Sequence, residues 1–193
     1  MKKVLLLLSE GFEIYEASTF IDVIGWNLID GDGSTQLFTC GITKEVKSTF
    51  AQKMIVDYTM DEINIDEYAA LAIPGGFEEY DFYKNAFAEP FLDLIRAYNG
   101  KNKLVASICT GAMPVAKSGI LNGKKGTTYN KTPGRQKMLS DMGVQVIQEP
   151  IVVEGNIITS WNPSTAMDVA FLLLEHLTSR KQVEHMKGLM GFL

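Results

Sequence analysis

Cysteine and histidine are scarce in this chain, with two of each among 193 residues. Cys40 and Cys109 could form at most one bridge, and a chain of this length can fold without a disulfide. We therefore expect reduced thiols and a cytoplasmic location. The histidines, His176 and His185, fall on or beyond the last predicted helix. Cysteine–histidine clusters for zinc are absent, and the acidic residues of 57–67 lack the spacing of a calcium loop, so we expect no metal and no cofactor.

Blocks of positive charge and long apolar runs are also missing. The 18 Lys and Arg residues are outnumbered by 23 Asp and Glu residues, which gives a formal net charge of −5. No basic run is long enough to follow a phosphate backbone, so we expect no nucleic acid partner. No segment approaches the ~20 apolar residues that span a bilayer, so we expect no membrane association. The short apolar run at 4–8 indicates a buried strand rather than a signal peptide.

What the chain does contain is hydrophobic residues, 46% of the total, in an alternating pattern of short apolar strands and amphipathic helices. This pattern predicts an α/β fold, with a mostly parallel sheet and helices on both faces, in a single domain over 1–193. The expected strands are 4–8, 36–40, 68–73, 104–108, 144–147, 151–153 and 157–159, with a hairpin within the loop 43–57. The expected helices are 17–28, 87–98, a segment after Cys109, 162–177 and 180–190.

Cys109 stands where a buried strand hands over to a helix. Residues 104–108 are apolar enough for a strand covered on both faces, and the small Thr110, Gly111 and Ala112 suit a sharp turn. Such a turn lifts a nucleophile into a cleft and places the sulfur near a helix N-terminus, which favours the thiolate. A lone cysteine is more often an inert, buried hydrophobe, but the turn residues favour the reactive interpretation here.

Two other segments should end beside Cys109, because reactive groups of an open parallel sheet gather beyond the carboxyl ends of its strands. Gly75 and Gly76 let backbone N–H groups approach a ligand, as an oxyanion hole requires, although Gly-Gly is also an ordinary turn. Glu16 opens the first helix, where a carboxylate can be merely a favourable dipole partner. Beside a thiolate in a covered crevice, however, the pKa of Glu16 would rise, and its neutral carboxyl could donate a hydrogen bond to sulfur.

Four motifs together resemble the ThiJ/PfpI superfamily. They are GFEIYE at 11–16, IPGG at 73–76, ICTGA at 108–112 and TSWNPSTA at 159–166, and they span nearly the whole chain in the right order. The sequence is most similar to the branch that contains the parkinsonism-associated protein and bacterial ThiJ-like homologues.

The resemblance implies a flavodoxin-like α/β sandwich, usually a homodimer, with Cys109 as the nucleophile on an elbow. It also implies that Glu16 hydrogen-bonds the sulfur and that Gly75, Gly76 and the Thr110 amide surround it. Family activities include glyoxalase or deglycase chemistry on α-oxoaldehydes, peptidase or amidase chemistry, isocyanide hydration, and redox-dependent protection through an oxidised cysteine. Fold alone does not choose among these.

The departures from the family pattern narrow this choice. Peptidase-like members have a histidine directly after the nucleophile, where this chain has Thr110, and many members have a histidine where Tyr129 stands. A cysteine–histidine peptidase or amidase is therefore disfavoured. Trp161 replaces a residue that is often small and polar or basic near the cleft, so the polarity of the substrate stays open. Tyr129 and Trp161 could be cleft walls or dimer contacts.

Two classes of function remain. In one, the Cys109 thiolate adds to the carbonyl of a small aldehyde, backbone amides hold the oxyanion, and Glu16 shuttles a proton. In the other, an oxidant converts Cys109 to a sulfenic or sulfinic acid that Glu16 stabilises, and the protein acts as a redox sensor or protective chaperone. Both need a low-pKa, accessible cysteine, so the residues alone do not separate them.

Overall fold

The computed structural model describes all 193 residues and is built around one seven-stranded sheet with the order β10-β11-β7-β6-β1-β2-β5. All neighbouring strands are parallel except β10 and β11, which are antiparallel. The strands of this sheet are β1 (Lys2–Leu8), β2 (Thr35–Gly41), β5 (Tyr58–Thr59), β6 (Tyr68–Ile73), β7 (Leu104–Ser107), β10 (Ile151–Glu154) and β11 (Ile157–Ser160). Five of these strands are parallel neighbours in the order β2-β1-β6-β7-β11. This is the order 2-1-3-4-5 of flavodoxin-like folds.

Seven helices and two small strand pairs complete the fold. The helices are α1 (Ile14–Ile29), α2 (Phe82–Ala86), α3 (Glu89–Gly100), α4 (Ala112–Lys117), α5 (Pro133–Asp141), α6 (Ala166–Leu177) and α7 (Arg180–Leu189). The small pairs are the antiparallel hairpin β3 (Glu45–Lys47) with β4 (Lys53–Ile55) and the parallel pair β8 (Lys125–Gly126) with β9 (Gln145–Val146). No helix combines the length and the apolar composition that crossing a bilayer requires.

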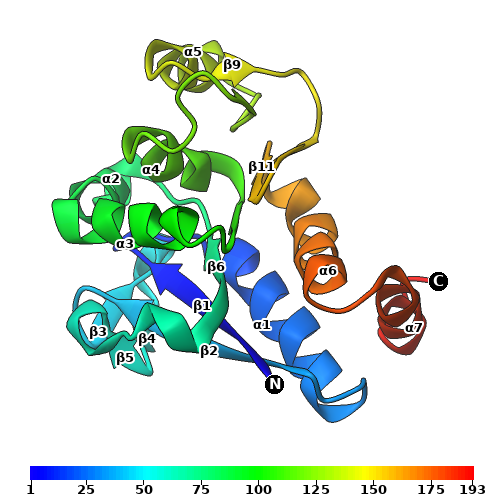
Figure 1. Cartoon of the computed structure of the whole chain (residues 1–193). Coiled ribbons are helices and arrows are strands. Elements are labelled where there is room, and N and C mark those ends of the chain that lie inside the picture. The colour runs from blue at the N-terminus through cyan, green and yellow to red at the C-terminus, as the bar shows by residue number, and fades with distance from the viewer.

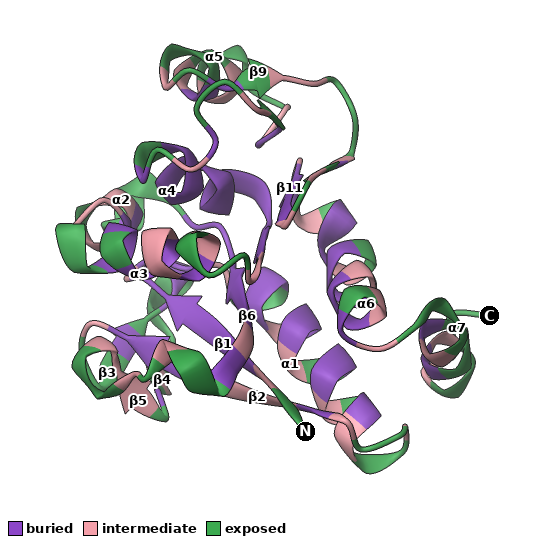
Figure 2. Ribbon diagram, viewed as in Figure 1, coloured by how far each residue is buried: buried purple, intermediate pink, exposed green.

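Helices cover both faces of the sheet, as predicted. Figure 1 shows α1 and α6 side by side on one face, with α7 outermost, and α2, α3 and α4 on the other. The alternation of β1 explains this layering: Val4, Leu6 and Leu8 pack toward α1 and α6, while Leu5 and Leu7 pack toward α3 and α4. Figure 2 shows β1 and the inward faces of the helices as buried. The predicted flavodoxin-like α/β sandwich is therefore confirmed.

The region 120–150 differs most from the predicted elements. The expected strand 144–147 is only the short β9, which pairs with β8 outside the central sheet, and the pattern did not predict α5. The reason is that α5 buries only Leu139 among its nine residues and so shows almost no apolar periodicity. Figure 1 places α5 and β9 together at the top of the molecule, and β8, the partner of β9, contacts β10 and β11 at one edge of the central sheet.

Candidate active site

Cys109 lies on a strained turn between β7 and α4. Its backbone has φ 54°, in the left-handed region that side chains other than glycine rarely adopt. The residue opens a short 3₁₀ helix, Cys109–Gly111, and is 6% exposed. A strained residue at the end of a parallel strand is typical of a nucleophile elbow, and such strain concentrates at functional sites.

Three hydrogen bonds hold this elbow in place: one to the end of β6, one within the turn and one from the segment after β8. The Ile108 amide donates to the Ile73 carbonyl at 3.1 Å, and the Gly111 amide donates to the Ile108 carbonyl at 2.8 Å. The hydroxyl of Thr128 donates to the Cys109 carbonyl, also at 2.8 Å. Sequence reasoning missed Thr128, which stands beside the recognised Tyr129. These bonds keep the left-handed conformation of Cys109 in the folded protein.

Glu16 lies in the first turn of α1 and is completely buried. Its Oε2 accepts a 2.6 Å hydrogen bond from the Gly75 amide, whereas its Oε1 has no hydrogen-bond partner. Burial raises the pKa of Glu16 to about 8, and the negative charge of Glu13 contributes further. Glu16 is therefore mainly protonated at neutral pH, as the sequence predicts for a carboxyl in a covered crevice.

The two glycines after β6 serve a different purpose from the expected oxyanion hole. The Gly75 amide is bonded to Glu16, and the Gly76 amide donates to the Thr110 hydroxyl at 2.9 Å. Thr110 in turn donates to the Gly76 carbonyl at 2.8 Å. Both amides are thus occupied and are not free to bind an oxyanion. A Cβ on Gly75 would lie 2.8 Å from the Thr110 hydroxyl and 2.9 Å from Glu16 Oε2, so glycine is needed there for close packing.

The electrostatics of Cys109 also differ from the expectation of a thiol acidified by a helix N-terminus. Burial raises the pKa of the Cys109 thiol well above its ordinary range, and the negative charge of Glu16 raises it further. Only the Thr110 amide faces the sulfur and lowers the pKa, because the Gly111 amide is bonded within the turn. Protonation of Glu16 removes its charge and provides a donor, so the reactivity of the thiol depends on the proton of its neighbour.

A cavity of about 350 Å³ opens above the sulfur, a volume that suits a small molecule. Its walls include Glu13, Cys109, Thr110, Tyr129, Arg135 and Pro163. Tyr129 therefore lies in the cleft wall, one of the two places considered for it. Sequence reasoning missed the charged residues of this wall, among them Glu13 and Arg135. Burial raises the pKa of Glu13.

Arg135 brings a cation to a cavity that is otherwise acidic. It lies at the start of α5, where the Thr132-Pro133 pair is a recognisable signal for a helix N-terminus. Its guanidinium donates to Glu78 at 3.0 Å and stands 5.2 Å from the centre of the Tyr83 ring. Glu78 and Arg135 both line the cavity, so their ion pair forms part of its wall.

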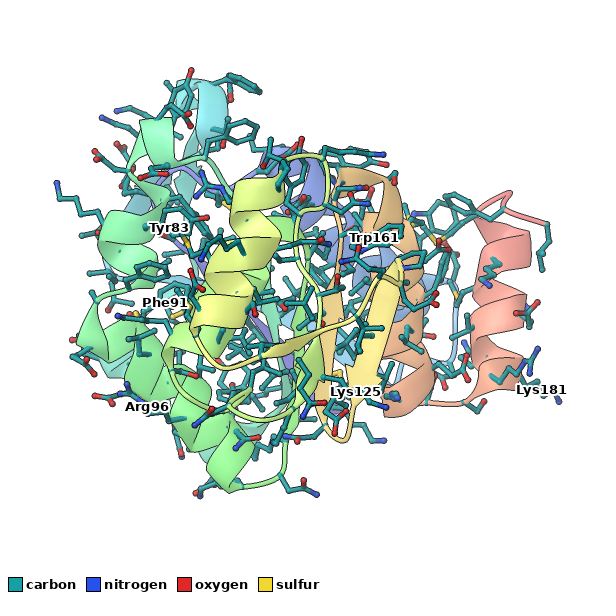
Figure 3. All side chains as sticks on the ribbon, turned by 90° about the horizontal axis from the view of Figure 1, so that it is seen from above. Tyr83, Phe91, Arg96, Lys125, Trp161 and Lys181 are labelled. Atoms are coloured by element: carbon teal, nitrogen blue, oxygen red, sulfur yellow. The ribbon has the colours of Figure 1, made fainter.

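Trp161 is not part of this wall. It is half-buried at the end of β11, and its amide donates to the Pro150 carbonyl at 3.0 Å. Figure 3 shows Trp161 beside the segment between β11 and α6, away from the side of the molecule that carries Tyr83. Pro163, two residues further along, contacts the cavity instead. The proposed cleft-wall role of Trp161 is therefore corrected.

The second cysteine, Cys40, is completely buried in β2 and forms no disulfide with Cys109. Burial raises its pKa to about 12, and the charges of Glu62 and Asp61 contribute. The fold brings together no group of three or more His, Cys, Asp or Glu side chains that could hold a metal ion. Of the two cysteines, only Cys109 lines the cavity.

Comparisons with known proteins agree with this architecture. The DJ-1/PfpI family model matches residues 2–176. Protein dj-1beta of Drosophila melanogaster is 30% identical over 148 residues, which cover 75% of each chain. Its crystal structure superposes with a TM-score of 0.85 over 98% of this chain and 97% of that one, at 24% identity.

A second relative is the Deglycase PfpI of Pyrococcus furiosus, which is 36% identical over 108 residues. This alignment covers 56% of the present chain and 61% of the deglycase, so the chain spans only about three fifths of that relative. The match to the family model over 2–176 and the shared fold are the stronger findings. This chain therefore belongs to the DJ-1/PfpI family, which confirms the resemblance predicted from its four motifs.

Proposed function

We propose that the protein is a cysteine-dependent enzyme acting on small α-oxoaldehydes, with glyoxalase or deglycase activity. The observation that carries the proposal is the placement of Cys109 on a strained elbow, beside the buried Glu16, at the base of a cavity of about 350 Å³. Two DJ-1/PfpI relatives from Pyrococcus with 35% and 36% identity are named deglycases. A cytoplasmic location goes with this proposal, because a reactive thiol persists in a reducing compartment.

In the proposed reaction, the Cys109 sulfur forms a bond to the aldehyde carbon as the carbonyl π pair moves to oxygen, which takes the thiol proton. The product is a hemithioacetal. Ionised Glu16, through the unpartnered Oε1, removes the proton on that carbon and returns it to the neighbouring carbon. The hydroxyl proton of the hemithioacetal moves to the neighbouring carbonyl oxygen in the same rearrangement, so the product is the thioester of a 2-hydroxy acid. Water then hydrolyses the thioester, releasing a 2-hydroxy acid and the free thiol.

The test is the turnover of methylglyoxal to lactate by the wild type, Cys109→Ser and Cys40→Ser. The expected result is turnover by the wild type and by Cys40→Ser, with a loss of at least about a hundredfold in Cys109→Ser. Equal turnover by all three chains, or none above the uncatalysed rate in the wild type, would refute the proposal. Cys40→Ser is the matched control because it removes the other thiol of the same chain.

A second candidate function is redox sensing or protection, and the unpartnered Oε1 of buried Glu16 favours it. An oxygen added to the nearby Cys109 sulfur would find this carboxyl as a hydrogen-bond partner. Each peroxide molecule transfers one oxygen atom to sulfur and leaves as water, so two equivalents give the sulfinate.

Mass spectrometry of peroxide-treated protein tests this second candidate. The wild type should stop at two added oxygen atoms on Cys109. Glu16→Leu, which lacks any donor, should resist oxidation or continue to three oxygens, and Glu16→Gln should behave more like the wild type. The same oxidation products in all three chains would exclude a role for Glu16 in stabilising the oxidised state.

A further inference from the structure

The last step of the proposed reaction, hydrolysis of the thioester on Cys109, requires a base for the attacking water. Water adds slowly to a thioester unless a neighbouring group takes its proton. The cavity wall contains no histidine that could do so. Glu16 is completely buried and already acts in the preceding rearrangement. The base for the water must therefore be another acceptor in the wall of the cavity.

Three carboxylates line the cavity together with Cys109, and they differ in their surroundings. They are Glu13, Glu78 and Glu79. Glu78 accepts a hydrogen bond from the Arg135 guanidinium at 3.0 Å, so its charge is already paired. Glu79 is exposed to solvent, whereas Glu13 is half-buried. Glu13 is therefore the one unpaired carboxylate that the protein partly shields from bulk water.

Glu13 holds the N-cap position of α1 without capping the helix. A capping side chain accepts a hydrogen bond from an amide of the first turn. The Glu13 side chain makes no such bond, and it lies in the wall of the cavity instead. Its carboxylate is thus left available to a molecule inside the cavity.

The backbone of Glu13 is fixed to the loop that surrounds the elbow. The Glu13 amide donates to the Gly75 carbonyl at 2.8 Å, and the Gly75 amide donates to Glu16 at 2.6 Å. A Cβ built on Gly75 would lie 2.9 Å from the Thr110 nitrogen, so this loop packs directly against the residue after Cys109. One short loop therefore positions Glu13, Glu16 and the elbow relative to one another, as an acid–base site requires.

A second hollow, of about 380 Å³, lies on the other side of Glu13. Its wall includes Thr49, Phe50 and Gln52, and Glu13 is the only residue that lines both hollows. Water can therefore reach the carboxylate from two sides. Burial raises the pKa of Glu13 above its ordinary 4.5, which makes this carboxylate a stronger base than an exposed one.

We propose that the Glu13 carboxylate is the general base for hydrolysis of the thioester on Cys109. This role rests on the proposed function. Glu13 takes a proton from water as the water oxygen bonds to the thioester carbon and the carbonyl π pair moves to oxygen. When that pair returns, the bond between carbon and sulfur breaks, its electron pair goes to sulfur, and sulfur takes the proton from Glu13. The products are the 2-hydroxy acid and the free thiol, and Glu13 is ionised again.

Glu13→Gln tests the proposal because it keeps the size of the side chain and removes the base. With methylglyoxal, we expect kcat to fall by about a hundredfold while the thioester accumulates on Cys109. Mass spectrometry after removal of methylglyoxal detects the thioester, because the hemithioacetal reverts under these conditions. The matched control is Glu10→Gln, which removes a carboxylate of the same segment outside both hollows and should behave like the wild type.

Two outcomes of this experiment would contradict the role of Glu13. One is an unchanged kcat, or a lower kcat without accumulated thioester, in Glu13→Gln. The other is accumulation of the thioester in Glu79→Gln instead, which would assign the base to the exposed carboxylate of the wall.

Acylation of Cys109 by p-nitrophenyl acetate separates the role of Glu13 from the proposed function, because this thioester forms without any rearrangement of methylglyoxal. Water should deacylate Glu13→Gln at least about tenfold more slowly than the wild type and Glu10→Gln. Hydroxylamine, a stronger nucleophile, should deacylate all three chains at similar rates. If the wild type shows this dependence on Glu13 but does not turn over methylglyoxal, the proposed function fails and the role of Glu13 stands. Equal deacylation by water in all chains, no acylation of Cys109, or an equal loss of the hydroxylamine reaction in Glu13→Gln would overturn that role.

Discussion

Glu16 makes the stability of the protein depend on pH in a defined direction. The fold raises the pKa of Glu16 from its ordinary 4.5 to about 8, so the folded state holds this proton more tightly than the unfolded state. Its contribution to the free energy of unfolding is complete below pH 4.5 and is lost as the pH rises through about 8. Each pKa unit corresponds to about 1.4 kcal/mol, so the loss amounts to several kcal/mol.

Glu16→Gln should remove this dependence. Thermal or urea unfolding of both chains between pH 4.5 and 8 checks it: the wild type should lose stability relative to Glu16→Gln as the pH rises. Glu13, whose pKa burial also raises, is present in both chains, so the difference between the chains reports Glu16 together with its repulsion by Glu13. Parallel pH profiles would mean that Glu16 ionises in the fold as freely as an exposed glutamate.

Cys109 and Cys40 should differ in their reaction with alkylating agents. Cys109 borders a cavity, whereas Cys40 is completely buried in β2 with a pKa raised to about 12. We expect iodoacetamide at neutral pH to label Cys109 at least about tenfold faster, as peptide mass mapping would measure. Faster labelling of Cys40 would contradict the assignment of the site.

Among single residues of the candidate site, those predicted from the sequence belong to a motif at the end of a strand. Cys109 and Glu16 lie where the turn residues and the strand ends predict them. The role of the Gly75 amide was beyond the sequence, because it depends on which acceptor reaches it in three dimensions. Arg135 was missed for a related reason: only the packing of α5 brings its guanidinium to the cavity wall beside Glu78, far away in the sequence.

The start of α6 shows what a single element contributes to the site. The Asn162 side chain accepts from the Ser164 amide at 3.1 Å and donates to Asn130 at 2.9 Å, so it caps the 3₁₀ turn Pro163–Thr165 that leads into α6 and ties it to the segment after β8. Asn162→Ala should cost about 1–2 kcal/mol and lower Tm by roughly 2–8 °C. Calorimetry of the variant measures this loss.

Ser179→Ala is the control for this element. Ser179 caps α7 through one 3.2 Å bond to the Gln182 amide, but it is exposed and links α7 to no other segment. Its loss should lower Tm by less than the loss of Asn162. Equal effects would show that the link between Asn162 and Asn130 adds nothing to capping.

Elements with a strong apolar pattern were predictable from sequence, and those without one were not. The strand at 68–73 was predicted with its exact bounds because buried strands read as continuous apolar runs. The first and last helices were placed to within a few residues. The short β8 and the weakly amphipathic α5 are held by their neighbours, β9 and α4, rather than by local sequence. The prediction of α5 would need that tertiary context.

At the scale of the whole molecule, α1 carries an exposed apolar stripe. Tyr15, Trp26 and Ile29 are 53%, 40% and 77% exposed, and their spacing places them on one side of the helix. We expect this stripe to meet its own copy in an isologous dimer. Light scattering at micromolar concentration should give a dimer for the wild type and a monomer for Trp26→Glu.

Val153→Glu, which alters an exposed apolar residue on β10, should leave the dimer intact. A monomeric wild type would contradict the proposed assembly. The organisation of 1–193 as one domain also stays a prediction, which a single cooperative unfolding transition would support.

The labelling rates of the two free thiols, compared with each other, show whether a variant has lost its fold or only its site. Cys40, which lies in β2 next to β1, can react only when the sheet opens, so its labelling rate reports how often the whole fold opens. Cys109 reports the state of the cavity while the sheet stays closed. A variant that slows Cys109 and leaves Cys40 protected has damaged the chemistry; one that releases Cys40 has damaged the fold. One labelling reaction, read by mass at two positions, therefore separates these two kinds of failure in a single sample.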